Sequence, residues 1–153
     1  MASAQTQVAN NVKAVFLYNF SKFVTWPTVS PSNGHFVIGI LGSNPFGNYL
    51  EQVVEGETVD GQKIDIQYYN DVSEIKSCHI LYITKSNAID VAKSLAGRTV
   101  LTVSDGDDFA RSGGIIRFMV ENNKIRLRIN QRHAKAAGLQ ISSKLLRVAD
   151  VIE

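Results

Sequence analysis

Cys78 and His79 are adjacent, and a thiol beside an imidazole is the pairing that cysteine nucleophiles use. They open an apolar run typical of a buried strand, and neighbouring residues on a strand point to opposite faces. This geometry predicts a buried structural thiol rather than a nucleophile. His35 and His133 are distant from His79 in the sequence, with no second ligand at metal-binding spacing. No metal site is predicted.

A group of carboxylates follows another apolar run. Asp105, Asp107 and Asp108 come directly after Ser104, at the strand end where α/β proteins collect functional groups. Clustered carboxylates bind a cation or act as acid and base. The spacing resembles the start of a calcium loop, but the twelfth position counted from Asp105 is Ile116 and not a glutamate. The favoured interpretation is a helix start, where acidic residues are stabilised, and no catalytic residue is predicted.

A glycine-containing loop, Gly42–Gly47, lies between an apolar run and a helical pattern, where phosphates often bind. It matches neither nucleotide-binding motif, because Pro45 lacks an amide donor and the phosphate-binding lysine is missing. An ordinary strand–helix turn is the favoured interpretation. A small ligand, where one binds, is expected at the ends of these two strands. The candidate ligand-binding residues are Gly42, Ser43, Asn44, Ser104, Asp105 and Asp108.

Two sets of residues are candidates for contact with a protein partner. The first is a stripe on the first predicted helix, made of Tyr18, Asn19, Lys22 and Trp26. Tyrosine and tryptophan are enriched at interface hot spots, but the same stripe suits packing against the last helix of the domain. The second set is Lys124, Arg126 and Arg128, which alternate on one face of a predicted strand. That row is a solvated face, a charged docking surface or the protection of an edge strand.

The spacing of apolar residues predicts the elements that carry these side chains. Val8, Val12, Phe16, Phe20 and Phe23 recur at intervals of three and four, which predicts a helix over residues 8–25 with this face turned inward. Pro27 disfavours helical geometry at Trp26 and ends the helix. Residues 28–34 are rich in Ser, Pro, Asn and Gly and are expected to form a loop.

The rest of the chain alternates between strand and helix patterns. Strands are predicted over 36–41, 64–68, 79–83 and 100–103, with helices after Pro45, over 86–96 and, as a short helix or turn, over 105–111. Residues 115–120 and 124–129 form a hairpin turning at 121–123, and short helices follow over 131–137 and 143–152. Ser142 or Ser143 caps the last helix, with Leu145, Val148 and Ile152 turned inward. The predicted fold is a three-layer α/β sandwich with a mainly parallel sheet, a C-terminal antiparallel hairpin and flanking helices.

Length and composition limit the class of protein. The 153 residues fit one domain, and 44% hydrophobic with 20% charged residues argues against disorder. A net charge of +2, with no basic run longer than a pair, gives no support for nucleic-acid binding. No apolar run approaches the roughly 20 residues that span a bilayer. No cofactor is predicted.

The N-terminus has one feature of exported proteins. Ala2-Ser3-Ala4 has the small-x-small form of a signal-peptide cleavage site, so residues 1–9 are interpreted as a stub left after cleavage and residues 10–153 as the domain. Cys78 is the only cysteine, so no disulfide forms within one molecule and this marker of an oxidising compartment is missing.

Several segments resemble the YfiR-like family. The resemblance begins with Lys13–Pro27, continues through Gly39–Gly42 and Cys78–Ile83, and includes Gly97–Asp105 with Gly113-Gly114. It ends with Ala137–Leu146, so that it covers about residues 10–150. The first and last of these motifs are long enough to make coincidence a poor explanation.

The resemblance implies a non-catalytic, periplasmic regulator that works by binding proteins. In the family's best-understood branch, a YfiR-like protein represses an inner-membrane diguanylate cyclase by holding its periplasmic sensor region inactive. An outer-membrane, peptidoglycan-associated lipoprotein draws the repressor away, so that cyclic-di-GMP and biofilm behaviour respond to envelope stress. A homodimer is a further expectation. That branch uses disulfides, which Cys78 alone cannot form within one chain.

A second hypothesis comes from a different class of protein. A periplasmic small-molecule sensor acting on a histidine kinase would bind its ligand at the strand ends near Gly42–Gly47 and Ser104–Asp108. The sequence leaves both hypotheses open.

Overall fold

The computed structural model describes residues 4–27 and 34–153. The predicted loop over residues 28–34 therefore lies almost entirely outside the described residues. The helices are α1 (Ala4–Phe23), α2 (Tyr49–Val54), the 3-10 helix η1 (Val72–Glu74), α3 (Ala88–Ser94), α4 (Phe109–Ser112), α5 (Gln131–Ala136) and α6 (Ser143–Leu146). The strands are β1 (Val24–Thr25), β2 (His35–Leu41), β3 (Thr58–Val59), β4 (Gln62–Tyr69), β5 (Ile80–Ile83), β6 (Leu101–Ser104), β7 (Ile116–Glu121), β8 (Lys124–Asn130), β9 (Gln140–Ile141) and β10 (Ala149–Ile152).

An eight-stranded sheet in the order β10-β8-β7-β6-β5-β2-β4-β3 forms the middle layer. Five of its neighbouring pairs are parallel, and only β7–β8 and β3–β4 are antiparallel. A separate antiparallel pair joins β1 to β9. The predicted α/β fold with a mainly parallel sheet and a C-terminal hairpin is confirmed.

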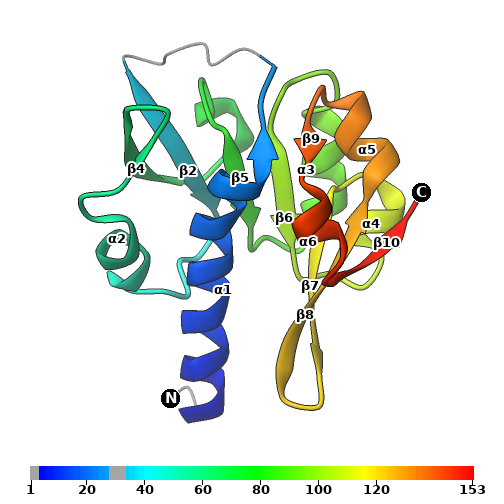
Figure 1. Cartoon of the computed structure of the whole chain (residues 1–153), viewed down its shortest axis with the longest axis horizontal. Helices are drawn as coiled ribbons and strands as arrows, with labels where there is room; N and C mark the ends of the chain where they lie inside the picture. The colour runs from blue at the N-terminus through cyan, green and yellow to red at the C-terminus, as the bar shows by residue number, and fades with distance from the viewer. Residues whose placement is uncertain (1–3, 28–33) are drawn as a thin grey trace.

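Helices cover both faces of the sheet, and each face has its own apolar core (Figure 1). On β5, Ile80 and Tyr82 belong to the core under α1 and α2, whereas Leu81 and Ile83 belong to the core under α3 and α4. Both faces of the strand are therefore buried, which explains why its sequence is a continuous apolar run without polar alternation.

Helix α1 begins earlier and projects further than the pattern suggested. It includes residues 4–9, which were interpreted as a stub preceding the domain, and it ends at Phe23 because Val24 and Thr25 pair with β9. Figure 1 shows its N-terminal half extending beyond the sheet, alongside the β7–β8 hairpin. Val8 is 61% exposed and Val12 is 38% exposed, so the prediction that they face inward is wrong. The apolar spacing continues past the point at which the sheet ends.

The C-terminus differs from the predicted helix over residues 143–152. Helix α6 stops at Leu146, and Ala149–Ile152 form β10, which pairs in parallel with β8. The Ser142 hydroxyl caps α6 by accepting from the Lys144 amide, as expected. Val148 lies in the turn between α6 and β10 and is 63% exposed, so the prediction that it turns inward is wrong.

Candidate functional site

The Cys78–His79 pair is divided between the two cores. Cys78 belongs to the core under α3, whereas the His79 ring stacks on Phe36 at 4.4 Å and meets Trp26 edge-on at 6.0 Å. Burial raises the pKa of the Cys78 thiol to about 12, and the thiol donates to the Ile80 carbonyl. The two side chains cannot act together, which agrees with the expectation of a structural thiol.

His79 holds a structural position. Its Nδ1 accepts a hydrogen bond from the Val37 amide at 3.0 Å, and its carbonyl accepts from the Trp26 indole at 3.2 Å. Desolvation by burial lowers the pKa of His79 below its ordinary value. Nδ1 must stay unprotonated to accept, so protonation would remove this bond and bury a positive charge.

Acidification is therefore expected to destabilise the protein through His79. The pKa of His79 is lower in the folded state than in the unfolded state, so below about pH 6.5 the unfolded chain binds more protons than the folded protein does. The free energy of unfolding therefore falls by up to about 1.4 kcal/mol for each pH unit of acidification. His79→Asn keeps an acceptor in place of Nδ1 and does not titrate. Thermal denaturation of both proteins from pH 7.5 to 5 should show the wild type losing more stability. Parallel curves would contradict the assignment.

The two predicted ligand loops do meet in space. They border a cleft of about 550 Å³ at the carboxyl ends of β5 and β6, next to α1. Its lining includes Ser43 and Pro45 from the first loop, Ser104–Asp108 from the second, and Thr84–Ser86 between them. Parallel strands end at one edge of a sheet, and this shared edge brings together loops about 60 residues apart in the chain.

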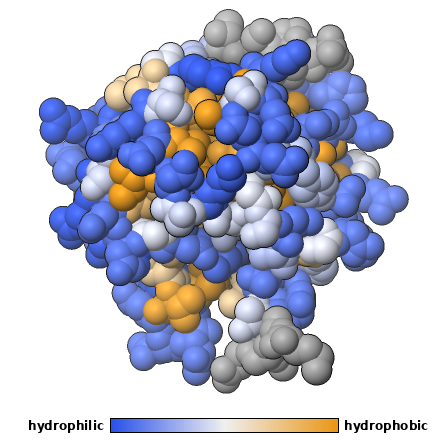
Figure 2. Space-filling view, turned by 180° about the vertical axis from the view of Figure 1, so that it is seen from behind, coloured by the Kyte–Doolittle hydropathy of each residue, from blue (hydrophilic) through white to orange (hydrophobic). Residues whose placement is uncertain are grey.

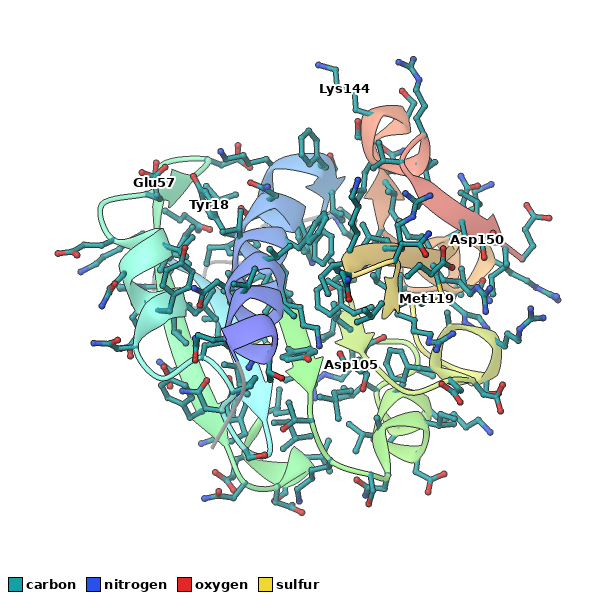
Figure 3. The ribbon with its side chains drawn as sticks, turned by 90° about the horizontal axis from the view of Figure 1, so that it is seen from below. Tyr18, Glu57, Asp105, Met119, Lys144 and Asp150 are labelled. Carbon is teal, nitrogen blue, oxygen red and sulfur yellow. The ribbon has the colours of Figure 1, made fainter. Side chains whose placement is uncertain are left out.

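A three-residue polar cluster forms the wall of the cleft nearest α1. Lys13 Nζ contacts Asp105 Oδ2 at 2.6 Å, and the Tyr82 hydroxyl donates to Asp105 Oδ1 at 2.7 Å. Burial raises the pKa of Tyr82 most, and the Asp105 carboxylate raises it further. The hydroxyl therefore stays protonated and donates. Figure 3, in which α1 is seen nearly end-on, shows Asp105 beside that helix. Lys13 is missing from the predicted ligand set, since nothing in the sequence links it to a residue 92 positions away.

The other predicted ligand residues have mixed positions. Ser104 lines the cleft but donates to the Ile83 carbonyl, and Asp108 is the N-cap residue of α4 without a side-chain capping bond. Gly42 and Asn44 are not part of the lining. The Asn44 side chain bonds within its own turn, and Gly42 has φ of 109° where an added Cβ would lie 2.4 Å from the Thr84 hydroxyl. Both are needed by the turn, as the favoured interpretation stated.

The carboxylates do not form a cation site. Asp107 contacts Arg117 at 2.9 Å, and both oxygens of Asp105 are engaged. No group of three or more His, Cys, Asp and Glu side chains is placed to hold a metal among residues 4–27 and 34–153.

Two of the partner-binding candidates are core residues. Tyr18 is 9% exposed and Trp26 is 7% exposed, so neither offers its ring to a partner. Figure 3 shows Tyr18 pointing toward Glu57, whose carboxylate accepts its hydroxyl, and Lys22 Nζ lies 4.5 Å from the Tyr18 ring centre. Neither of these contacts of Tyr18 is with the last helix, so they do not support the alternative expectation that the stripe packs against that helix. Asn19 is partly exposed and Lys22 is exposed.

The basic row on β8 divides into two parts. Arg128 pairs with Asp150 of β10 at 2.7 Å, so this part of β8 is not an edge strand. Lys124 and Arg126 lie beyond the end of β10 and are exposed.

The charge is unevenly distributed along the chain. Residues 109–153 contain nine Lys and Arg against three Asp and Glu, whereas residues 1–108 contain seven Lys and Arg against eleven Asp and Glu. The C-terminal part therefore favours acidic partners.

An apolar groove runs between α1 and the hairpin. It has a volume of about 750 Å³ and contains no acidic residue among those that line it: Thr6, Val8, Ala9, Asn10, Val12, Lys13, Phe16, Val120, Asn123, Lys124 and Ile125. Val8 and Val120 on its two walls are 61% and 63% exposed. Figure 2 shows exposed hydrophobic atoms at the lower end of the view, where α1 and the hairpin project. The sequence pattern predicted Val8, Val12 and Phe16 of this groove as core residues, whereas Lys124 was one of the predicted partner-binding residues.

The domain thus has two candidate binding surfaces, a polar cleft and an exposed apolar groove. The chain belongs to the YfiR/HmsC-like family, whose sequence model matches residues 10–150. The expected resemblance is thereby confirmed, and the family is one of regulatory proteins. No curated protein matches the chain significantly. None of the helices in the described residues combines the length and apolar character needed to cross a membrane.

Proposed function

We propose that this protein is a periplasmic regulator that binds and represses the sensor region of an inner-membrane diguanylate cyclase. Its release would raise cyclic-di-GMP and favour biofilm formation. A peptidoglycan-associated lipoprotein of the outer membrane is the proposed competitor that draws it away, and a homodimer is the proposed resting form. Membership of the YfiR/HmsC-like family supports this role.

The observation that carries the proposal is the groove between α1 and the hairpin. Val8, Val12 and Val120 expose apolar surface that no other part of the described chain covers. Removing such surface from water is worth about 25 cal/mol per Å², which makes the groove a source of binding free energy. Lys124 on its rim, with no ion pair among the described residues, favours a partner segment with an apolar face and acidic flanks.

Repression through this groove needs differential affinity. A regulator shifts the cyclase only to the extent that it binds the inactive sensor more tightly than the active one. Holding the partner at about a hundred times its dissociation constant contributes about 2.7 kcal/mol, which is enough for a switch. The groove therefore needs no chemistry of its own to control an enzyme.

Val8→Asp is expected to weaken binding of the cyclase's periplasmic segment at least about tenfold, because a charge would replace apolar contact area in the groove. Calorimetric titration with the periplasmic segment of a membrane diguanylate cyclase from the same organism measures the dissociation constant. The melting temperature should stay nearly unchanged, since Val8 is 61% exposed.

Val148→Asp is the matched control, because Val148 is 63% exposed but lies between α6 and β10, away from the groove. It should bind as the wild type does. Equal weakening by both substitutions, or by neither, would remove the groove from the proposed mechanism. No binding of wild-type protein to a folded sensor segment would overturn the choice of partner.

A further inference from the structure

The polar cleft and the apolar groove share a wall. Asn10 and Lys13, on successive turns of α1, line both cavities. Two polar contacts tie this half of the helix to the strand ends: Asn10 Nδ2 donates to the Pro45 carbonyl at 3.3 Å, and Lys13 pairs with Asp105 at 2.6 Å. A molecule in the cleft would therefore touch residues that also shape the groove.

The cleft offers charges of both signs. Lys13 and Lys85 supply two ammonium groups, and Asp105 and Asp108 supply two carboxylates. Asp107 pairs with Arg117 and is 95% exposed, so it points less into the cleft than the other two carboxylates do. Hydroxyl groups of Ser43, Thr84 and Ser86 complete the polar lining. Neither Lys85 nor Asp108 forms a salt bridge within the described residues, although the positive charge of Lys85 contributes to lowering the pKa of Asp71. A ligand group of opposite charge can therefore still approach each of them.

This balance of charge selects one class of ligand. A purely anionic ligand would face Asp105 and Asp108, and a purely cationic one would face Lys13 and Lys85, with repulsion in each case. A ligand carrying both charges replaces the Lys13–Asp105 contact with two contacts of the same kind and leaves no charge unpaired. We propose that the cleft binds a small zwitterion, with its carboxylate or phosphate toward the two lysines and its ammonium toward the two aspartates.

The site is also placed to influence the groove. Lys13 Nζ lies 6.0 Å from the ring centre of Phe118, and that ring lies 6.1 Å from the ring of Phe16, which lines the groove. A ligand that draws Lys13 away from Asp105 would therefore change the contact of Lys13 with Phe118, and through Phe118 the position of Phe16 in the groove. The ligand site itself stands whether or not the groove binds a cyclase.

Three probes with similar carbon chains and different charges test the proposal: 5-aminopentanoate, glutarate and cadaverine. With ¹⁵N- and methyl-labelled full-length protein, 5-aminopentanoate is expected to bind with a dissociation constant of about 1 mM. It should shift the amide signals of residues 84–86 and 104–108. Glutarate and cadaverine should bind at least tenfold more weakly, because each of them loses one charged contact. The methyl signals of Val8 and Val12 should shift with the same midpoint.

Variants separate the two parts of the proposal. Asp105→Asn and Lys13→Met should each reduce zwitterion binding at least about tenfold, and Lys144→Met, at an exposed position of α6, should not. Figure 3 shows Lys144 projecting away from the domain. Equal binding of all three probes, or no binding of the zwitterion to wild-type protein, overturns the ligand site. Zwitterion binding without a shift at Val8 and Val12 overturns the coupling. Because the three-probe comparison uses wild-type protein, a variant that misfolds leaves it intact.

Discussion

Tyr18→Ala is expected to lower the free energy of unfolding by about 3–4 kcal/mol. The side chain is 9% exposed and belongs to the core between α1, α2 and the sheet, so its truncation removes buried apolar contacts and leaves a cavity. It also leaves Glu57 without the hydroxyl donor and Lys22 without the ring below its ammonium. Urea denaturation at pH 7 measures the loss.

Tyr18→Phe separates the ring from the hydroxyl. It keeps the core contacts and the Lys22 interaction and removes only the bond to Glu57, so a loss of about 1 kcal/mol is expected. Lys22→Glu changes an exposed side chain and should cost less than about 1 kcal/mol. If Tyr18→Ala left the stability unchanged and weakened partner binding, Tyr18 would be an interface residue after all.

Gly114→Ala is expected to destabilise the protein by about 3 kcal/mol or more. A Cβ at this position would lie 2.1 Å from Cε2 of Phe109, and the Phe109 side chain is fully buried. The neighbouring backbone has little freedom to move, because the Gly114 amide donates to the Phe109 carbonyl and the Gly114 carbonyl contacts the His133 ring at 2.7 Å. The clash therefore cannot be relieved by rotating a flexible side chain.

Gly106→Ala is the control for Gly114→Ala. Gly106 lies in the loop beside the cleft, and an added Cβ would meet no atom within 4 Å. The melting temperature of the Gly106→Ala variant should match that of the wild type, with a change in the free energy of unfolding within about 0.5 kcal/mol. Equal melting temperatures for the two variants would show that the packing of Gly114 on Phe109 is looser than an approach of 2.1 Å implies.

The local pattern of the sequence was sufficient for most elements. Continuous apolar runs predicted β2, β5 and β6, because a strand buried on both faces must be apolar at every position. The two glycine- and aspartate-containing loops were correctly expected at strand ends, and parallel topology brought them to one cleft. The motifs from Lys13 to Leu146 were sufficient to indicate the family.

Burial on α1 could not be predicted in the same way. A helical period shows which residues share a face, but not how far the opposing surface extends. The sheet ends before the helix does, so Phe20 is buried while Val8, on the same apolar stripe, is exposed. The same limit applies to Tyr18 and Trp26, whose interleaved polar neighbours suggested a surface stripe although Glu57, Phe36 and His79 cover them.

The sequence by itself determined the order of the main strands and helices as far as α5, the class of fold and the family. Each of these depends on residues that are close together in the chain, or on motifs in a fixed order. Only the tertiary structure decided that β10 is a strand, that Lys13 reaches Asp105, and that α1 and the hairpin leave a groove between them. These features depend on which segments, distant in sequence, lie opposite one another. Burial and strand pairing each need two surfaces, and the periodicity of one segment describes only its own surface.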